Sequence, residues 1–164
     1  MKVAHETPHG AVPVEPPRGM YPARLDEKGR LKLPVEFQKY LAGLAEKKLF
    51  VTSKDRRMAT VYPIEIWREN EKLLANFRDN PKALQRVWFT SQDLGTEAEM
   101  DGQGRVQFST DLRRDLNIEN RPVRVLVVHG AIQVMSEEMF QARRAEAAQS
   151  VEDDLEVLER AGFK

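Results

Sequence analysis

The sequence predicts a mixed α+β protein in which two tandem βαβ-type units pack as an intramolecular pseudo-dimer, with short β-strands and peripheral helices. An internal repeat, alternating apolar positions and amphipathic stretches of helical spacing together predict it. Each copy would hold about 40–55 residues of ordered core, and a unit of that size is only marginally stable alone. We therefore expect the two copies to share one core.

The repeat is clearest at two glycine-containing turns. Residues 25–37 read LDEKGRLKLPVEF and residues 100–112 read MDGQGRVQFSTDL, so that an aspartate, a glycine and an arginine coincide at an offset of 75 residues. We expect Gly29 and Gly104 to adopt the positive φ that a tight hairpin needs. Because glycine has no side chain, each turn can also approach a ligand closely.

Each turn is followed by an alternating strand, a short helix, a second strand pair and a longer helix. Pro34 and Ser109 suit the starts of the short helices. For the second strand pairs, we expect strands at 49–52 and 60–62 in the first copy, and at 123–128 and 131–135 in the second.

These elements divide the chain into five expected segments. Pro8, Pro13, Pro16 and Pro17 cannot donate backbone hydrogen bonds, so the first segment is expected to be a flexible arm. The segments are the proline-rich arm (1–20), the first unit (21–76), a helical connector (77–95), the second unit (96–150) and a C-terminal helix (151–164).

Composition excludes several classes of protein. The chain has 26 basic and 26 acidic residues and no cysteine, which excludes a uniformly basic nucleic-acid coat, disulfides and thiolate sites. No apolar run is long enough to span a membrane and no signal peptide is visible, so we expect a cytoplasmic protein. A local basic patch stays possible, because residues 21–48 contain seven basic and four acidic residues.

The repeated Asp-x-x-x-Arg element is the candidate binding feature. An arginine presents a planar fork suited to guanine O6 and N7 or to phosphate, and a nearby aspartate can hold that fork in one orientation. This points to Arg30 held by Asp26, and Arg105 held by Asp101. From the motif alone, an equally open interpretation is that each pair pins its turn and contacts nothing else.

Basic residues around the first turn favour the binding interpretation. We expect Arg24, Lys28 and Lys32 to share one basic surface with the arginine of this turn. The second copy has Gln103 and Gln107 at the positions of the two lysines, so the first copy is expected to dominate electrostatic binding.

The segments LDEKGRLKLP, YPIEIW and DGQGR resemble the MraZ family over about residues 20–160. The resemblance implies two AbrB-like swapped-hairpin units in a sequence-specific DNA-binding transcriptional regulator. Members typically repress their own promoter ahead of the division and cell-wall gene cluster, bind short G-containing direct repeats as ring-shaped homo-oligomers and associate with the nucleoid. The candidate DNA-binding residues are Arg30, Arg105, Asp26, Asp101, Lys28, Gly29, Gly104, Arg24 and Lys32.

The expected partners are double-stranded DNA and further copies of the chain, with no membrane, small-molecule substrate, cofactor or metal. His5 and His9 have a helical metal spacing, but Pro8 lies between them. No phosphate loop, nucleophile elbow or catalytic triad is visible, so an enzyme is not expected. The aromatic residues Trp67, Phe77, Trp88 and Phe89 are interpreted as core or subunit packing rather than as base-stacking groups.

Two alternatives stay open. One is an AbrB-like oligomeric protein-interaction module, related in role to an antitoxin or a co-regulator, with secondary DNA contact. The other is transcriptional activation in place of repression, since the sign of regulation depends on promoter geometry.

Overall fold

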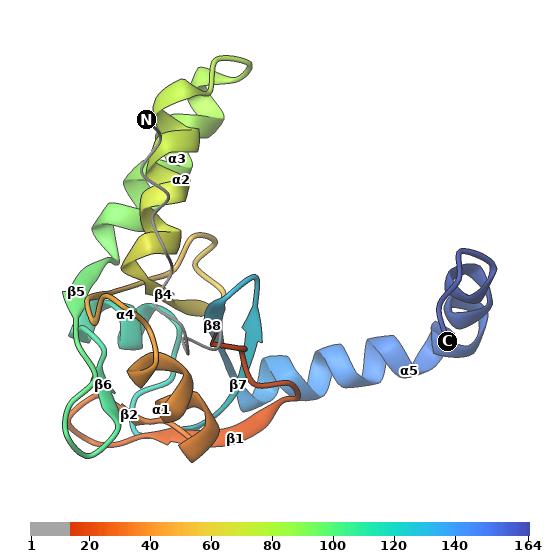
Figure 1. Ribbon diagram of the computed structural model, residues 1–164, viewed down its shortest axis with the longest axis horizontal. Helices are drawn as coiled ribbons and strands as arrows, with labels where there is room; N and C mark the ends of the chain where they lie inside the picture. The colour runs from red at the N-terminus through yellow and green to blue at the C-terminus, as the bar shows by residue number, and fades with distance from the viewer. Residues whose placement is uncertain (1–13) are drawn as a thin grey trace, which may run out of the picture.

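The computed structural model describes residues 14–164; His5, His9 and most of the expected arm lie outside the described residues. The fold contains five helices and eight strands in this part of the chain (Figure 1). In chain order they are β1 (Tyr21–Leu25), β2 (Arg30–Lys32), α1 (Val35–Ala42), β3 (Leu49–Thr52), β4 (Ala59–Pro63), α2 (Ile64–Asn76), α3 (Pro81–Asp93), β5 (Thr96–Ala98), β6 (Arg105–Gln107), α4 (Thr110–Asp115), β7 (Pro122–Val128), β8 (Ala131–Ser136) and α5 (Glu137–Arg160).

The same succession of two strands, a helix, two strands and a helix occurs twice, and α3 lies between the two halves. All eight strands form one antiparallel sheet in the order β5-β3-β4-β8-β7-β1-β2-β6. The predicted mixed helix and strand architecture is therefore confirmed. Helix α3 occupies the expected connector, and α5 continues without a break across the expected boundary at residue 150.

The two halves exchange strands throughout this sheet. Four of the seven strand pairings among residues 14–164 join one half to the other, namely β1–β7, β2–β6, β3–β5 and β4–β8. An unpaired strand edge leaves backbone donors and acceptors without partners. Neither half can therefore complete its own sheet, and the two halves fold as one body.

The main core contains residues of both halves, from central strands and from the edge strand β6. Leu31 of β2 and Val106 of β6 face each other in the register and are both fully buried. Phe37 of α1 and Leu112 of α4 are also fully buried and belong to the same cluster. One continuous core therefore joins the two halves.

Turns and helix starts follow local chemistry. Pro34 and Ser109 each cap a short helix instead of lying inside it, and the Ser109 hydroxyl accepts a hydrogen bond from the Leu112 backbone at 3.2 Å. His129 and Gly130 both have positive φ, 50° and 80°, as the two-residue turn between β7 and β8 requires.

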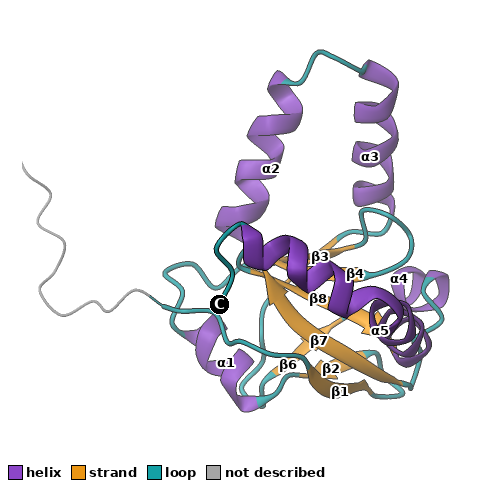
Figure 2. Cartoon of the chain, turned by 90° about the vertical axis from the view of Figure 1, so that its right-hand side faces the viewer, coloured by secondary structure: helices purple, strands orange, loops and turns teal. Residues whose placement is uncertain are grey.

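Three helices extend beyond the sheet (Figures 1 and 2). Helices α2 and α3 project together as a hairpin, whereas α5 projects separately and has no buried residue. Trp67 at the base of α2 packs in the core, against Phe50 and Tyr62, which is one of the two kinds of packing predicted for it. Trp88 and Phe89 of α3 are 42% and 67% exposed, so they do not belong to the core of one chain.

We expect Gly29→Ala to destabilise the fold by about 1–2 kcal/mol, because Gly29 has a φ of +79° that disfavours a side chain. An added Cβ would also lie 2.0 Å from Nη1 of Arg113 and displace that side chain. The measurement is the free energy of unfolding in urea. Gly102→Ala is the matched control, since nothing lies within 4 Å of its added Cβ and its φ is not positive. Equal stability of the two variants would contradict the prediction.

Candidate nucleic-acid interface

The candidate interface is the outward face of β1, β2 and β6, together with the turns that precede β2 and β6. Strands β2 and β6 pair antiparallel around the buried Leu31 and Val106. Because side chains alternate along a strand, the residues on either side of these two point outward. The outward residues are Arg30 and Lys32 on β2, and Arg105 and Gln107 on β6.

In the first turn, one carboxylate fixes both the backbone and the arginine. Oδ1 of Asp26 accepts hydrogen bonds from the backbone N–H groups of Lys28 at 3.0 Å and of Arg30 at 2.9 Å. Oδ2 accepts from Nε of Arg30 at 2.8 Å. The Gly29 N–H donates to the Asp26 carbonyl at 3.0 Å, which closes the turn. The guanidinium plane is therefore set by the same group that shapes the turn.

The second turn repeats this geometry. Oδ1 of Asp101 accepts from the backbone N–H groups of Gln103 and Arg105, both at 2.9 Å. Oδ2 accepts from Nε of Arg105 at 2.9 Å, and the Gly104 N–H closes the turn at 3.0 Å. Gln103 replaces Lys28 at the third position of the turn without any change in this pattern, because only the backbone N–H of this residue donates to the aspartate.

Both arginines keep part of their fork available. Of the three nitrogens of each guanidinium, the aspartate binds only Nε. Within residues 14–164, the terminal nitrogens of Arg30 and Arg105 make no hydrogen bond or ion pair. The two side chains are 29% and 25% exposed. A guanidinium held at one edge presents its remaining N–H groups in a fixed direction. Each turn therefore offers an oriented donor pair at the surface.

The glycines of the two turns lie against side chains of the opposite half. A Cβ on Gly29 would lie 2.0 Å from Nη1 of Arg113, and a Cβ on Gly104 would lie 2.1 Å from Cδ of Gln38. These two side chains also donate to backbone carbonyls of their own half, at 2.6 and 2.7 Å. Each turn thus rests on a helix side chain that the other half supplies.

Two long side chains connect the turns across the β2–β6 pair. Lys32 Nζ donates to the Gln103 carbonyl of the second turn. Gln107 Nε2 donates to the Lys28 carbonyl of the first turn at 2.8 Å. The backbone N–H groups that follow β2 and β6 also donate to the glycine carbonyls of the opposite turns, at 3.0 and 2.8 Å. The two turns are therefore held at a fixed separation.

The strand register arranges the predicted basic residues in a way that the sequence did not indicate. Arg24 of β1 lies opposite Lys32 of β2, and Lys32 lies opposite Arg105 of β6. These three exposed or half-buried side chains form a row across three strands, which we call the basic row. Arg30 lies opposite Gln107 instead. Basic residues of the first copy thus accompany the arginine of the second turn.

Hydrogen bonding lowers the pKa of both turn carboxyls below the ordinary value of 3.8. For Asp26 the largest cause is the backbone N–H of Arg30, and for Asp101 it is the backbone N–H of Arg105. Each arginine side chain lowers the pKa further. Both aspartates are consequently ionised at neutral pH, where they hold the arginines.

Sequence reasoning missed the supporting residues Gln38, Arg113 and Gln107. The first two lie at the repeat offset of 75 residues and directly follow the aligned pair Phe37 and Leu112. Extending the repeat by one position would have shown them as structural equivalents. Gln107 occupies the position of Lys32 in the second copy. Because both side chains are long hydrogen-bond donors, the sequence did contain a sign that they have equivalent roles.

Comparison with known proteins places the chain in a family. It is 32% identical over 142 residues to the transcriptional regulator MraZ of Acidobacterium capsulatum, covering 87% of this chain and 97% of that protein. The chain belongs to the MraZ family. Relatives of the same name in Koribacter versatilis and Nocardia farcinica are 37% and 35% identical, over 62% and 82% of this chain and 70% and 89% of theirs. A search of protein-family models found no match.

The family assignment confirms the resemblance predicted from the turn motifs. The relatives carry the name of a transcriptional regulator, which is not an enzymatic role. Within residues 14–164, no three histidine or acidic side chains are grouped so that they could hold a metal ion. No helix in the described part of the chain is both long and apolar enough to cross a membrane.

We expect the carboxyl groups of Asp26 and Asp101 to titrate below pH 3.8 in the folded protein, as measured by carboxyl ¹³C NMR. A lowered folded pKa means that the carboxylates stabilise the fold above the unfolded pKa, and that this stabilisation is lost as the pH falls through the folded pKa. Arg30→Met should raise the Asp26 midpoint only in part, because the backbone N–H of residue 30 stays in place. A midpoint at or above 3.8 in the unmodified protein would show that these hydrogen bonds do not form.

Proposed function

We propose that the chain is a sequence-specific regulator of transcription that reads double-stranded DNA with Arg30 and Arg105. The observation that carries the proposal is the shared geometry of the two turns, in which an aspartate holds Nε and leaves the terminal nitrogens free. Guanine presents two acceptors, O6 and N7, in the major groove, and a bidentate arginine contact discriminates by about 1–3 kcal/mol. The names of the relatives support a role in transcription.

The aspartates make these arginines more effective readers. A free arginine loses much side-chain entropy when it binds, about 0.5–1.5 kcal/mol for an immobilised long side chain. Asp26 and Asp101 restrict their arginines before DNA arrives, so less of the contact energy is lost. Gly29 and Gly104 are buried against Arg113 and Gln38, so the missing side chains make room for these supporting residues. Lys28, which is exposed in the first turn, would contact phosphate.

A neutral chain can bind DNA if its charge is unevenly distributed. The net formal charge is zero, but Arg24, Lys32 and Arg105 lie together on the outward face. Phosphate contacts supply affinity and position the protein, whereas base contacts supply specificity. We assign Arg24 and Lys32 of the basic row to phosphates, and the two turn arginines, Arg30 and Arg105, to bases.

We propose further that the protein acts as a ring-shaped homo-oligomer. One arginine pair discriminates too weakly to find one promoter, and linked subunits on repeated G-containing sites multiply weak contacts. Exposed apolar side chains support association. On the α2–α3 hairpin they are Leu73, Val87, Trp88 and Phe89, and on α5 they are Val151, Leu155 and Leu158. Such patches on a soluble protein mark interaction surfaces.

The regulatory role follows from the family resemblance. We propose that the two halves, residues 21–76 and 96–150, are AbrB-like units in which hairpins are exchanged. The proposed targets are short G-containing direct repeats at the protein's own promoter, ahead of the division and cell-wall gene cluster, where binding represses transcription. The bound protein would then be associated with the nucleoid.

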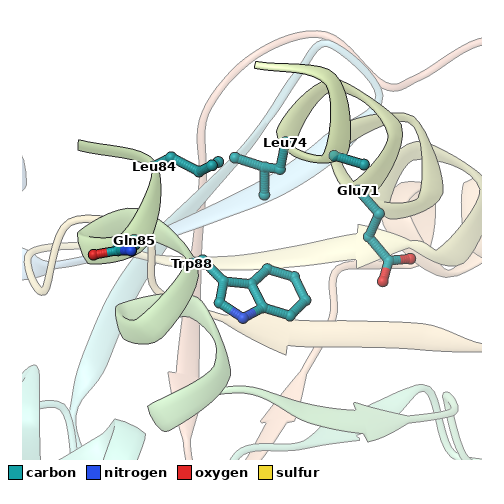
Figure 3. A pocket seen from close by; sticks show the side chains of 6 residues that line it. Glu71, Leu74, Leu84, Gln85 and Trp88 are labelled. Atoms are coloured by element: carbon teal, nitrogen blue, oxygen red, sulfur yellow. The ribbon is translucent and has the colours of Figure 1, made fainter. Parts of the chain in front are cut away.

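A protein-interaction module is the second candidate, and one observation favours it. An apolar groove of about 410 Å³ lies between α2 and α3, lined by Leu74, Leu84 and Trp88 among others (Figure 3). Leu74 and Leu84 point toward each other from the two helices, and Trp88 lies beside them (Figure 3). In this reading the hairpin binds another protein, and DNA contact is secondary.

We expect Arg30→Ala to abolish sequence-specific DNA binding without loss of fold or assembly, because Arg30 is half-buried and does not belong to the core cluster. The measurement is selection of bound duplexes from a random library, followed by fluorescence anisotropy on the enriched sequence at two salt concentrations. Arg57→Ala is the matched control, since Arg57 is exposed in the β3–β4 loop, away from the turns. Wild-type affinity of the Arg30 variant would refute its assignment and favour the interaction module.

We expect Phe89→Glu to reduce the oligomer to smaller species, because it places a charge on a surface proposed to be buried between subunits. Phe89 is 67% exposed in the single chain, so the change leaves folding intact. The measurement is mass photometry, with light scattering at higher concentration. Val35→Glu is the control, as Val35 is a similarly exposed residue on α1, 60% exposed. An unchanged mass distribution for the Phe89 variant would exclude this face from the assembly.

A further inference from the structure

Resting on the proposed DNA-binding function, we propose that the interface has a built-in polarity. The end at the second turn holds the DNA backbone more strongly than the end at the first turn. Each subunit consequently binds an asymmetric site in one orientation, even though its two turns have the same geometry.

Charge differs between equivalent positions of the two halves around the turns. The two turns match closely in their hydrogen bonds, but the residues around them do not match in charge. Among exposed positions around the turns, four pairs at the offset of 75 residues differ in this way: Arg24 with Glu99, Glu27 with Gly102, Lys28 with Gln103, and Lys32 with Gln107. All eight residues are exposed. The backbone geometry is therefore repeated, whereas the electrostatics are not.

The strand register brings the basic residues of the first half together at one end of the interface, beside the second turn. Because β2 and β6 are antiparallel, Lys32 lies at the end of the second turn, and Arg24 lies opposite it. Three basic side chains and one carboxylate, Asp101, then surround the second turn. The first turn has two exposed or half-buried basic side chains, Arg30 and Lys28, and two carboxylates in its own loop. A third basic side chain, Arg113, lies against Gly29, but it is only 12% exposed and donates to the Phe108 carbonyl of its own half.

This uneven charge determines the orientation in which a duplex binds. A reader with a true two-fold axis binds equally well in both directions, which is why symmetric dimers use palindromic sites. Here the phosphates follow the outward face from one turn to the other and meet more positive charge at the second turn. Phosphate contacts fix register and orientation. The favoured direction is the one that brings the closer phosphates to the basic row.

Affinity cleavage of DNA can report this orientation directly. The chain has no cysteine, so Gly102→Cys creates a single attachment point for an iron–EDTA reagent at the tip of the second turn. An added Cβ meets nothing within 4 Å there and no charge is altered. The DNA is a duplex with one copy of the sequence enriched from the random library, so that one subunit is placed at one site.

In the favoured orientation, cleavage should occur on one side of the site, exceeding the other side by roughly tenfold, the factor that about 1.4 kcal/mol supplies. The same reagent on Glu27→Cys, at the equivalent tip of the first turn, should cut the opposite side with a smaller bias, because this change removes one of the two carboxylates of the first turn. Equal cleavage on both sides with either probe, on a duplex that is bound specifically, would overturn the polarity and leave the proposed function standing. If no sequence is enriched at all, the proposed function fails, and the inference fails with it.

A charge exchange tests whether the basic row is the cause. Lys32→Gln combined with Gln107→Lys moves one positive charge to the other end without changing the net charge. Both replacements are long donors, and each finds the same backbone carbonyl, of Gln103 or of Lys28, across the strand pair. Thermal unfolding should therefore match the wild type, and the cleavage ratio should fall to about one or reverse. A preserved fold with an unchanged ratio would overturn the proposal.

Discussion

The pairing of β2 with β6 is the constraint on which the rest of the structure depends. This pairing joins the two copies. The residue after each strand therefore donates its backbone N–H to the glycine carbonyl of the other copy's turn. The distances are 3.0 Å from Leu33 to Gly104 and 2.8 Å from Phe108 to Gly29. The same two strands place Leu31 and Val106 at the centre of the core. The core and the support of both turns therefore depend on the same strand pairing, since each turn accepts a backbone hydrogen bond from the opposite half.

This constraint explains how short loops can present arginines with little freedom. A loop of four residues normally pays a large conformational entropy when it binds a ligand. Here each turn is closed by its aspartate, supported by a helix side chain of the opposite half and linked across the strand pair by a lysine or a glutamine. The conformational entropy of each turn is therefore lost during folding, before any ligand binds. The surface then offers two oriented guanidinium groups on a rigid sheet, which is the arrangement that reading base edges requires.

Local chemistry was enough to predict much of this from the sequence. Gly29, Gly104 and the His129-Gly130 turn follow from positive φ, the second strand pairs follow from alternation, and the two Asp-x-x-x-Arg motifs identify the family. The resemblance implied exchanged hairpins, but the pairing of strands could not be derived from the residues, because the register of β1 with β7 depends on packing between residues about a hundred positions apart. The basic row was missed for the same reason. Helical periodicity also marked α3 as amphipathic without saying that Trp88 stays 42% exposed on the single chain.

A duplicated chain can do what a symmetric dimer cannot. In a dimer of identical subunits, any change at one turn appears at both, so geometry and charge stay symmetric together. Here the cross-link from each strand to the opposite turn needs only a long donor, and Lys32 and Gln107 satisfy it equally. The backbone frame therefore places no demand on charge at these positions, and the two halves are free to diverge there. Symmetry is retained where hydrogen bonds build the turns and lost in the charges of the outward face. In the proposed function, one fold thereby combines a repeated reading element with a direction along the duplex.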